Sequence, residues 1–267
     1  MGSSFLITLR EGLEASLIVA ILLTYLSKTN RKQDARYVWI GTASAALACL
    51  VVGTAIYLAV SGLNGKVEMA VEGTIALVAA AVLTQMIFWM RKNSQMLSAE
   101  LRAKVDKSAK TALFTIAFVA VVREGLETVL FLLSAETTSA SGASVVIGGL
   151  VGLVASVGLG VAIFAGGRKI DLKKFFNVTA VLLILFAAGL AGKAVHEYRE
   201  LIGWENGWFV QPAWDIKNGM WASGTFYDFM KGFFGWSSVA ENIRVITYFV
   251  FLVPTLYFFR KPVKSAA

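Results

Sequence analysis

Seven apolar stretches dominate this chain and restrict it to one class of fold. They cover residues 5–27, 37–60, 67–90, 111–134, 143–165, 175–195 and 243–259. Each is close to the length of about 20 residues that an α-helix needs to cross the hydrocarbon core of a bilayer. Hydrophobic residues make up 57% of the chain and charged residues only 16%, which is unusual for a soluble globular domain. We therefore expect an all-α integral membrane protein, with seven transmembrane helices in a single domain (residues 1–267).

The positive charge of the chain, formally +8, is concentrated in alternate connections between these stretches. The basic residues of the odd-numbered connections and of the C-terminal tail are Lys28, Arg31, Lys32, Arg36, Arg91, Lys92, Arg102, Lys104, Lys107, Lys110, Arg168, Lys169, Lys173, Lys174, Arg260, Lys261 and Lys264. The second connection has only Lys66, and the fourth has none. By the positive-inside rule, the N-terminus is outside and the C-terminus is cytoplasmic. The charge thus indicates topology and contact with anionic membrane lipid, with no nucleic-acid partner.

A charged five-residue string, R-E-G-L-E, occurs at residues 10–14 and again at 123–127, both times inside an apolar stretch. Charges in hydrocarbon are costly and usually mark a substrate or ion path. Each string opens a block of three spans, residues 1–91 and 111–195. Because three is an odd number, the second block enters the membrane from the opposite side, as in transporters with inverted repeats. An external aromatic-rich loop (196–242), in which 220–234 could form short interfacial or re-entrant helices, and a seventh helix (243–259) lie outside this repeat.

The acidic residues of the two strings are predicted to lie at one depth in the membrane. Glu11 and Glu14 are six and nine positions from the outer end of their span, and Glu127 and Glu124 are seven and ten positions from the outer end of theirs. At about 1.5 Å of rise per residue, both pairs lie roughly 10 to 15 Å below the outer surface. We therefore expect the four carboxylates to face each other.

Four converging carboxylates would repel each other unless a cation lies between them. Arg10 and Arg123 balance part of the charge and leave a formal excess of two negative charges, which favours a multivalent cation. Carboxylate oxygens suit hard cations, and a chain with one Cys and one His is poorly equipped for copper or zinc. The alternative is that each Arg pairs only with the Glu four positions later, as a neutral brace between helices. Glycines 12 and 125 allow close approach of a neighbouring helix in either case.

Further polar residues near the outer ends of the spans are candidates for an access route. Glu68 and Glu72 share one face of the third span, and His196 and Glu200 lie one turn apart after the sixth. The alternative for Glu68 and Glu72 is a position at the membrane interface, and for His196 and Glu200 it is a solvated helix end.

The doubled R-E-G-L-E string, together with Glu72-Gly73 in the third span, resembles the oxidase-dependent iron permease family, in particular its bacterial branch. The resemblance implies a plasma-membrane protein that imports iron, ferrous or ferric, as its transported substrate and has no permanently bound cofactor. It also implies that Glu11, Glu14, Glu124 and Glu127 bind the ion, and that an external ferroxidase or iron-delivery protein is a partner. The acidic motif that fungal members carry in an external loop has no clear equivalent here.

Two other functions are compatible with paired intramembrane carboxylates. One is a carrier for a divalent metal, manganese or lead, on the same scaffold. The other is a membrane di-iron oxidoreductase, although such centres normally contain Glu-x-x-His pairs and neither string contains His. We expect a transporter rather than an enzyme, with iron entering from the outside and passing between the two strings.

Overall fold

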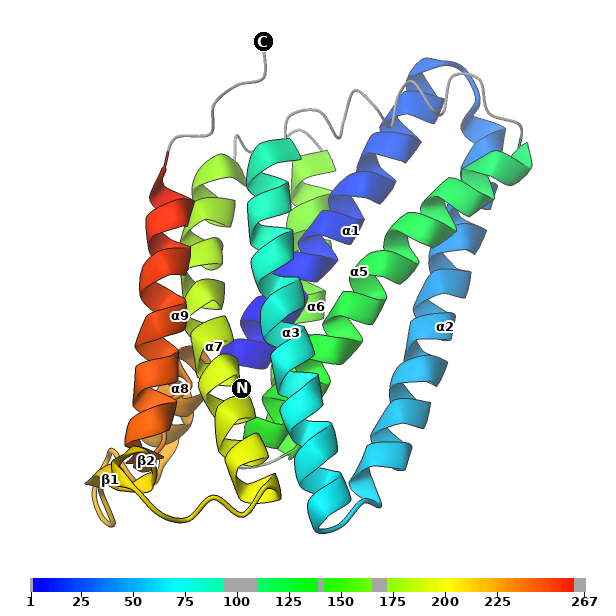
Figure 1. Cartoon of the computed structure of the whole chain (residues 1–267). Coiled ribbons are helices and arrows are strands. Elements are labelled where there is room, and N and C mark those ends of the chain that lie inside the picture. Colours follow the sequence, from blue (N-terminus) through cyan, green and yellow to red (C-terminus); the bar gives the residue numbers. More distant parts are fainter. Residues whose placement is uncertain (1, 94–109, 139–141, 165–171, 262–267) are drawn as a thin grey trace.

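The computed structural model of the chain describes residues 2–93, 110–138, 142–164 and 172–261. Within these ranges it is almost entirely helical (Figure 1). The long helices are α1 (Gly2–Lys28), α2 (Ala35–Ser61), α3 (Lys66–Asn93), α5 (Lys110–Thr138), α6 (Gly142–Phe164), α7 (Leu172–Leu201) and α9 (Asn242–Arg260). Each coincides with one predicted span, and α7 extends furthest beyond its predicted end, by six residues.

Five of these helices, α2, α3, α6, α7 and α9, are long and apolar enough to cross a membrane. The prediction of an all-α integral membrane protein with several membrane-spanning helices is thereby confirmed. The other two long helices, α1 and α5, have 27 and 29 residues and carry the charged strings near their centres. That these two also cross the membrane, giving seven spans, stays a prediction.

The helices pack mainly in pairs that join the first three helices to the next three. The most extensive contacts are between α1 and α6, between α2 and α5, and between α3 and α7, and α1 also crosses α5. Figure 1 shows α1 and α5 steeply tilted and running in opposite directions, whereas α3, α7 and α9 stand nearly parallel to one another. The crossing of α1 and α5 brings the middles of the two charged helices together.

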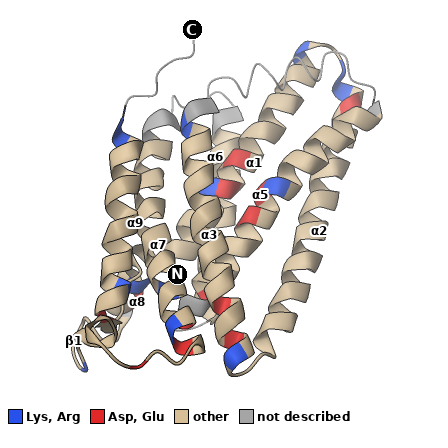
Figure 2. Cartoon of the chain, viewed as in Figure 1, with Lys and Arg blue, Asp and Glu red and all other residues tan. Residues whose placement is uncertain are grey.

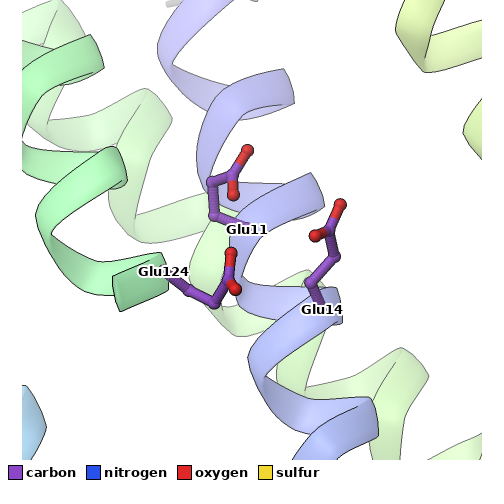
Figure 3. A group of neighbouring side chains, drawn as sticks. All are labelled: Glu11, Glu14 and Glu124. Carbon is purple, nitrogen blue, oxygen red and sulfur yellow. The ribbon is translucent and has the colours of Figure 1, made fainter. Parts of the chain in front are cut away.

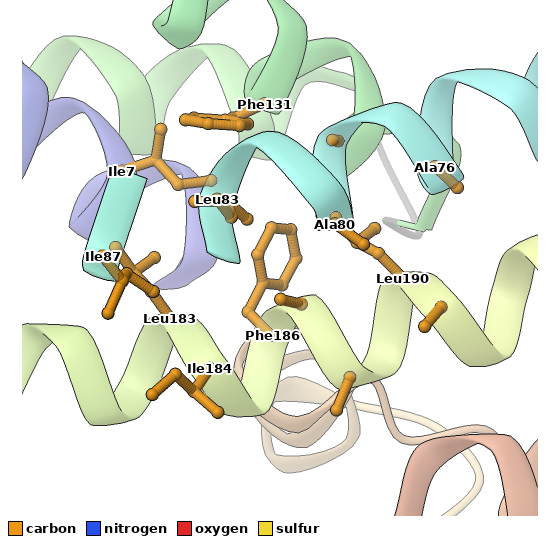
Figure 4. Close-up of a cluster of buried hydrophobic side chains, with 14 of the residues drawn as sticks. Ile7, Ala76, Ala80, Leu83, Ile87, Phe131, Leu183, Ile184, Phe186 and Leu190 are labelled. Atoms are coloured by element: carbon orange, nitrogen blue, oxygen red, sulfur yellow. The ribbon is translucent and has the colours of Figure 1, made fainter. Parts of the chain in front are cut away.

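The larger buried core lies where α3 packs on α7 (Figure 4). Its contacts are close because small side chains face each other, with Ala76 and Ala80 on α3 and Ala187 and Ala191 on α7. Small residues let helix backbones approach in membrane proteins, where packing rather than the hydrophobic effect drives association. A second buried cluster joins α1, α2 and α5. These two cores fix the helices that carry the charged strings.

The segment after α7 folds into a small cap, defined here as residues 202–241, at one end of the bundle. It contains a 3-10 turn (Trp208–Val210), the short helix α8 (Thr225–Phe234), and an antiparallel pair of strands, β1 (Pro212–Asp215) and β2 (Val239–Glu241). The rings of Trp214 and Trp236 stack 5.0 Å apart. The helix α8 falls within the predicted range 220–234, but the strand pair was not predicted.

The cap is attached to the bundle by backbone contacts at glycine. Gly235, which ends α8 with φ of 66°, lies directly against Gly189 of α7, and a Cβ atom at either position would overlap the other backbone. Gly2 at the start of α1 likewise lies against the ring of Phe233. The cap is therefore held against both α7 and the first turn of α1.

Candidate metal site

Three carboxylates from two helices converge at the crossing of α1 and α5. One oxygen from each of Glu11, Glu14 and Glu124 lies within 4.8 Å of the others, and all three residues are buried. Figure 3 shows Glu11 and Glu14 on successive turns of α1, with Glu124 reaching toward them from α5. Figure 2 shows that these charges lie halfway along the two helices, far from the charged ends of the bundle. The arrangement could hold a cation among three oxygen ligands.

The fourth predicted ligand, Glu127, lies beside this group but is engaged by an arginine. Its Oε1 accepts a hydrogen bond of 3.1 Å from Arg123 Nε. On α1, Arg10 Nε lies 3.2 Å from Glu14 Oε1 in the equivalent ion pair. Each Arg thus pairs with the Glu four positions later, as in the brace that the sequence left open.

The remaining glutamate is Glu11 in the first string and Glu124 in the second. Arg123 Nε is 4.0 Å from Glu124 Oε1, farther than the 3.1 Å that separates it from Glu127 Oε1. Both oxygens of Glu11 and Oε2 of Glu124 are buried and have no hydrogen-bond partner among the described residues. A buried carboxylate without such a partner is costly, and a bound cation would offset that cost. The brace and the cation site are therefore compatible: Glu11 and Glu124 are available to a cation, and Glu14 takes part in both arrangements.

The two arginines differ in their surroundings although their local sequences are identical. The Arg10 side chain is 2% exposed, whereas that of Arg123 is 48% exposed and its guanidinium lies 4.8 Å from the ring centre of Trp89. The site is thus more accessible from the Arg123 side, next to α3. Sequence reasoning missed Trp89, which lies 34 positions away and has no motif of its own.

Glycines 12 and 125 bring a neighbouring helix against each string, as predicted. A Cβ atom at Gly125 would lie 2.5 Å from Cys49 Sγ of α2, and one at Gly12 would clash with Ser156 of α6. Each string is therefore in direct contact with another helix at its glycine.

Among the candidate access residues, Glu72 belongs to a charged cluster between α3 and α7. Lys193 Nζ donates a hydrogen bond of 2.7 Å to Glu72 Oε2 and lies 3.7 Å from Glu197 Oε1. Glu68, by contrast, is exposed near the start of α3. The sequence analysis missed Lys193, although a lysine inside an apolar stretch was a signal that could have found it.

His196 and Glu200 lie in the last turns of α7, and a residue that was not predicted joins them. His196 Nδ1 lies 3.0 Å from Glu241 at the end of β2, and Arg199 donates a hydrogen bond of 2.9 Å to the same carboxylate. His196 Nε2 is 3.7 Å from Glu200. These contacts fasten the cap to α7, so His196 and Glu200 belong to a structural network at the cap end of the bundle.

Comparison with known proteins places the chain in a family. The profile of the Iron permease FTR1 family matches residues 1–258. The chain is 38% identical to ferrous iron permease EfeU of Yersinia pestis over 98% of its own length and 94% of that relative. It is 35% identical to ferrous iron permease EfeU of Escherichia coli O157:H7, over 98% and 96% of the two chains. No solved structure matches. A family profile that covers nearly the whole chain, together with relatives aligned over nearly their full lengths, shows that this protein belongs to the iron permease FTR1 family.

Proposed function

We propose that this protein is an iron permease that imports iron across the plasma membrane, the inner membrane in a bacterium, through the carboxylates at the crossing of α1 and α5. The family and the relatives are named permeases, so the chain is a transporter rather than an enzyme. The observation that carries the proposal is the convergence of Glu11, Glu14 and Glu124 within 4.8 Å at the middle of the bundle.

The geometry of the three oxygens suits a small hard cation. Metal–oxygen distances of about 2.1 Å place two ligands on opposite sides of an ion about 4.2 Å apart. The observed spread of 4.8 Å needs only a small movement of flexible glutamate side chains to close around an ion. In the described part of the chain, the donor set of this group contains only carboxylates, which are the ligands that a hard ion such as ferric iron prefers.

Charge balance also supports a multivalent substrate. The two strings contribute four glutamates and two arginines, which leaves a formal charge of −2 in a buried place. A divalent or trivalent ion compensates this charge, whereas a single proton or sodium ion does so only in part. Glu127 completes the set when the ion passes toward α5, because its Oε2 is buried without a hydrogen-bond partner in the described structure.

The first three and the next three helices would form an inverted repeat, in which α1 and α5 each contribute glutamates to the site. The contacts of α1 with α6 resemble those of α5 with α2. In the first pair of helices, Gly12 contacts Ser156 and Ser16 contacts Gly160. At the corresponding positions of the second pair, Gly125 contacts Cys49 and Val129 contacts Gly53. Positions 12 and 125 are 113 apart, as are 16 and 129; positions 49 and 156 are 107 apart, as are 53 and 160. The sequence offset is thus constant between α1 and α5 and again between α2 and α6. These constant offsets favour a two-fold relationship between the two blocks rather than a chance similarity of the strings.

The direction of transport follows from the expected topology, with the cap outside and the basic connections in the cytoplasm. An inside-negative membrane potential of 100 mV contributes about 2.3 kcal/mol for each elementary charge that crosses, so about 7 kcal/mol for a trivalent ion. Iron would then enter from the cap side, lie among the glutamates, and leave when the two repeats rearrange. An external ferroxidase or iron-delivery protein would supply it.

The test is uptake of radiolabelled iron by the purified protein in liposomes under an imposed potential, with ferrous and ferric iron supplied separately. We expect Glu11→Gln and Glu124→Gln each to reduce uptake at least tenfold, because each removes a charged oxygen ligand from the group that would hold the ion. The matched control is Glu205→Gln, since Glu205 is an exposed acid of the cap. Wild-type uptake by both site variants would refute the site, and stronger competition by manganese than by iron would refute the substrate.

A further inference from the structure

A polar cavity lies between the cap and the bundle, and none of the glutamates of the metal site lines it. Its volume is about 230 Å³, and its lining comes from α3, α7, α8, the segment that follows α8, and α9. Three basic side chains reach it from three different helices: Lys193 from α7, Lys231 from α8 and Arg244 from α9. We propose that this cavity is a binding site for a small oxyanion, of the phosphate or carboxylate class.

The ion pairs in the cavity leave an excess of positive charge. The carboxylates of the lining are Glu72 and Glu197, and both lie within 4.0 Å of Lys193. Lys231 and Arg244 have no carboxylate within this distance and no hydrogen bond from their charged groups in the part of the chain that the structure describes. Lys231 makes only a cation–π contact with Tyr227, at 5.8 Å. Two cations therefore face the same space without a direct ion-pair partner, although Asp228 acts on Lys231, and Glu241 and Glu197 act on Arg244, at longer range.

Such an arrangement is unfavourable unless something negative occupies the cavity. Burial, and then the neighbouring charges of Lys193 and Arg244, lower the pKa of Lys231. An anion between Lys231 and Arg244 would remove both the repulsion and part of the desolvation cost. The guanidinium of Arg244 offers paired donors that match the geometry of phosphate or carboxylate oxygens, and the Tyr227 hydroxyl supplies a further possible donor.

The positive charge of the lining also distinguishes this cavity from a binding site for a metal ion without accompanying ligands. A multivalent cation beside Lys231 and Arg244 would be repelled by both, whereas an oxyanion, alone or as the ligand that accompanies a metal, would be attracted. Glu72 and His196, which the sequence suggested as an access route, line this cavity. Lys231 and Arg244 beside them therefore favour an anion at this position. This inference stands whether or not the glutamate site carries iron.

The test is isothermal titration calorimetry of the full chain in detergent, in chloride buffer, with inorganic phosphate and then citrate as titrants. We expect saturable binding of one phosphate per chain. Lys231→Gln and Arg244→Gln should each weaken it at least about tenfold, because each removes a charge-assisted hydrogen bond. The control is Lys217→Gln, which removes the same charge from a cap side chain that is 79% exposed and outside the cavity.

Several results would overturn the proposal. They are an absence of saturable binding to the wild type, wild-type affinity in Lys231→Gln, or equal weakening by Lys217→Gln. Because Arg244 is largely enclosed, its variant is first checked for a wild-type elution volume and helix content; Lys231→Gln, on a short surface helix, decides the question if Arg244→Gln does not fold. Repeating the titration in nanodiscs with and without anionic lipid shows whether the natural anion is a lipid headgroup or a free oxyanion. Phosphate binding that weakens only with anionic lipid supports the site with a lipid headgroup as occupant, and unchanged binding supports a free oxyanion.

Discussion

Adding one methyl group at Gly125 should destabilise the protein by a predictable amount. A Cβ atom there would lie 2.5 Å from Cys49 Sγ and 3.1 Å from Cys49 Cβ, so α2 and α5 must move apart or the thiol must rotate. Overpacking of this kind typically costs about 1–3 kcal/mol. Alanine also favours a helix over glycine by about 0.5–1 kcal/mol, and this gain must be separated from the clash.

Gly158→Ala provides that separation. Gly158 lies in α6, is exposed, and has no atom within 4 Å of the position of an added Cβ. It therefore gains the helix preference without a clash, and the difference in free energy of unfolding between the two variants measures the packing cost alone. For a chain of this size, about 1–3 kcal/mol corresponds to a difference in melting temperature of about 2–12 °C.

Removing the obstructing side chain should cancel the cost. In a Cys49→Gly background the thiol and the Cβ atom are both absent. Gly125→Ala should then change the free energy of unfolding by about as much as Gly158→Ala does in the wild type. The assay is thermal unfolding in detergent, followed by tryptophan fluorescence, for the four members of this double-mutant cycle. The reasoning is refuted if Gly125→Ala is as stable as Gly158→Ala, or if its cost is the same with and without Cys49.

Three further predictions follow from the surroundings of the charged residues. Arg10→Gln should lower the melting temperature more than Arg123→Gln, because Arg10 is 2% exposed and its loss leaves Glu14 buried without its ion pair; the same unfolding assay would contradict this by giving the opposite order. Trp89→Leu should cost about 0.5–2 kcal/mol through the lost contact with Arg123, and a variant that also carries Arg123→Gln should show no additional loss from this contact. Glu241→Gln should loosen the cap by weakening its bonds to His196 and Arg199; hydrogen exchange should increase in residues 208–241, while Asp215→Asn, at an exposed ion pair with Lys217, should leave it unchanged.

The helices and the central charges could be predicted because their signals are local. A run of about 20 apolar residues must satisfy its own backbone hydrogen bonds in lipid and therefore forms a helix. Spacings of three and four within the strings place Glu11 with Glu14, and Arg10 with Glu14, on one face. The meeting of α1 with α5 required one further step, from the duplication and the calculated depth. The structure brings Glu124 to Glu11 and Glu14, whereas Glu127, the fourth predicted ligand, is not part of this group, and the depth itself stays a prediction.

The features that were missed depend on contacts between distant parts of the chain. Glu72 and Lys193 are 121 positions apart, and only the packing of α3 on α7 joins them. The strands β1 and β2 are four and three residues long, too short for an alternating pattern to be recognised. Identical strings could not indicate that Arg10 would be enclosed and Arg123 partly exposed, because that difference comes from Trp89 and other neighbours outside the strings.

The contact between Gly189 and Gly235 has a consequence for how the protein can move. With no side chain on either residue, the backbones of α7 and the cap touch directly and have no compliant layer between them. A tilt of α7 during transport would then be passed on to the cap as a rigid displacement. The cap would thus move together with the helices, and a ligand or protein bound to the cap would sense the state of the helices beneath it.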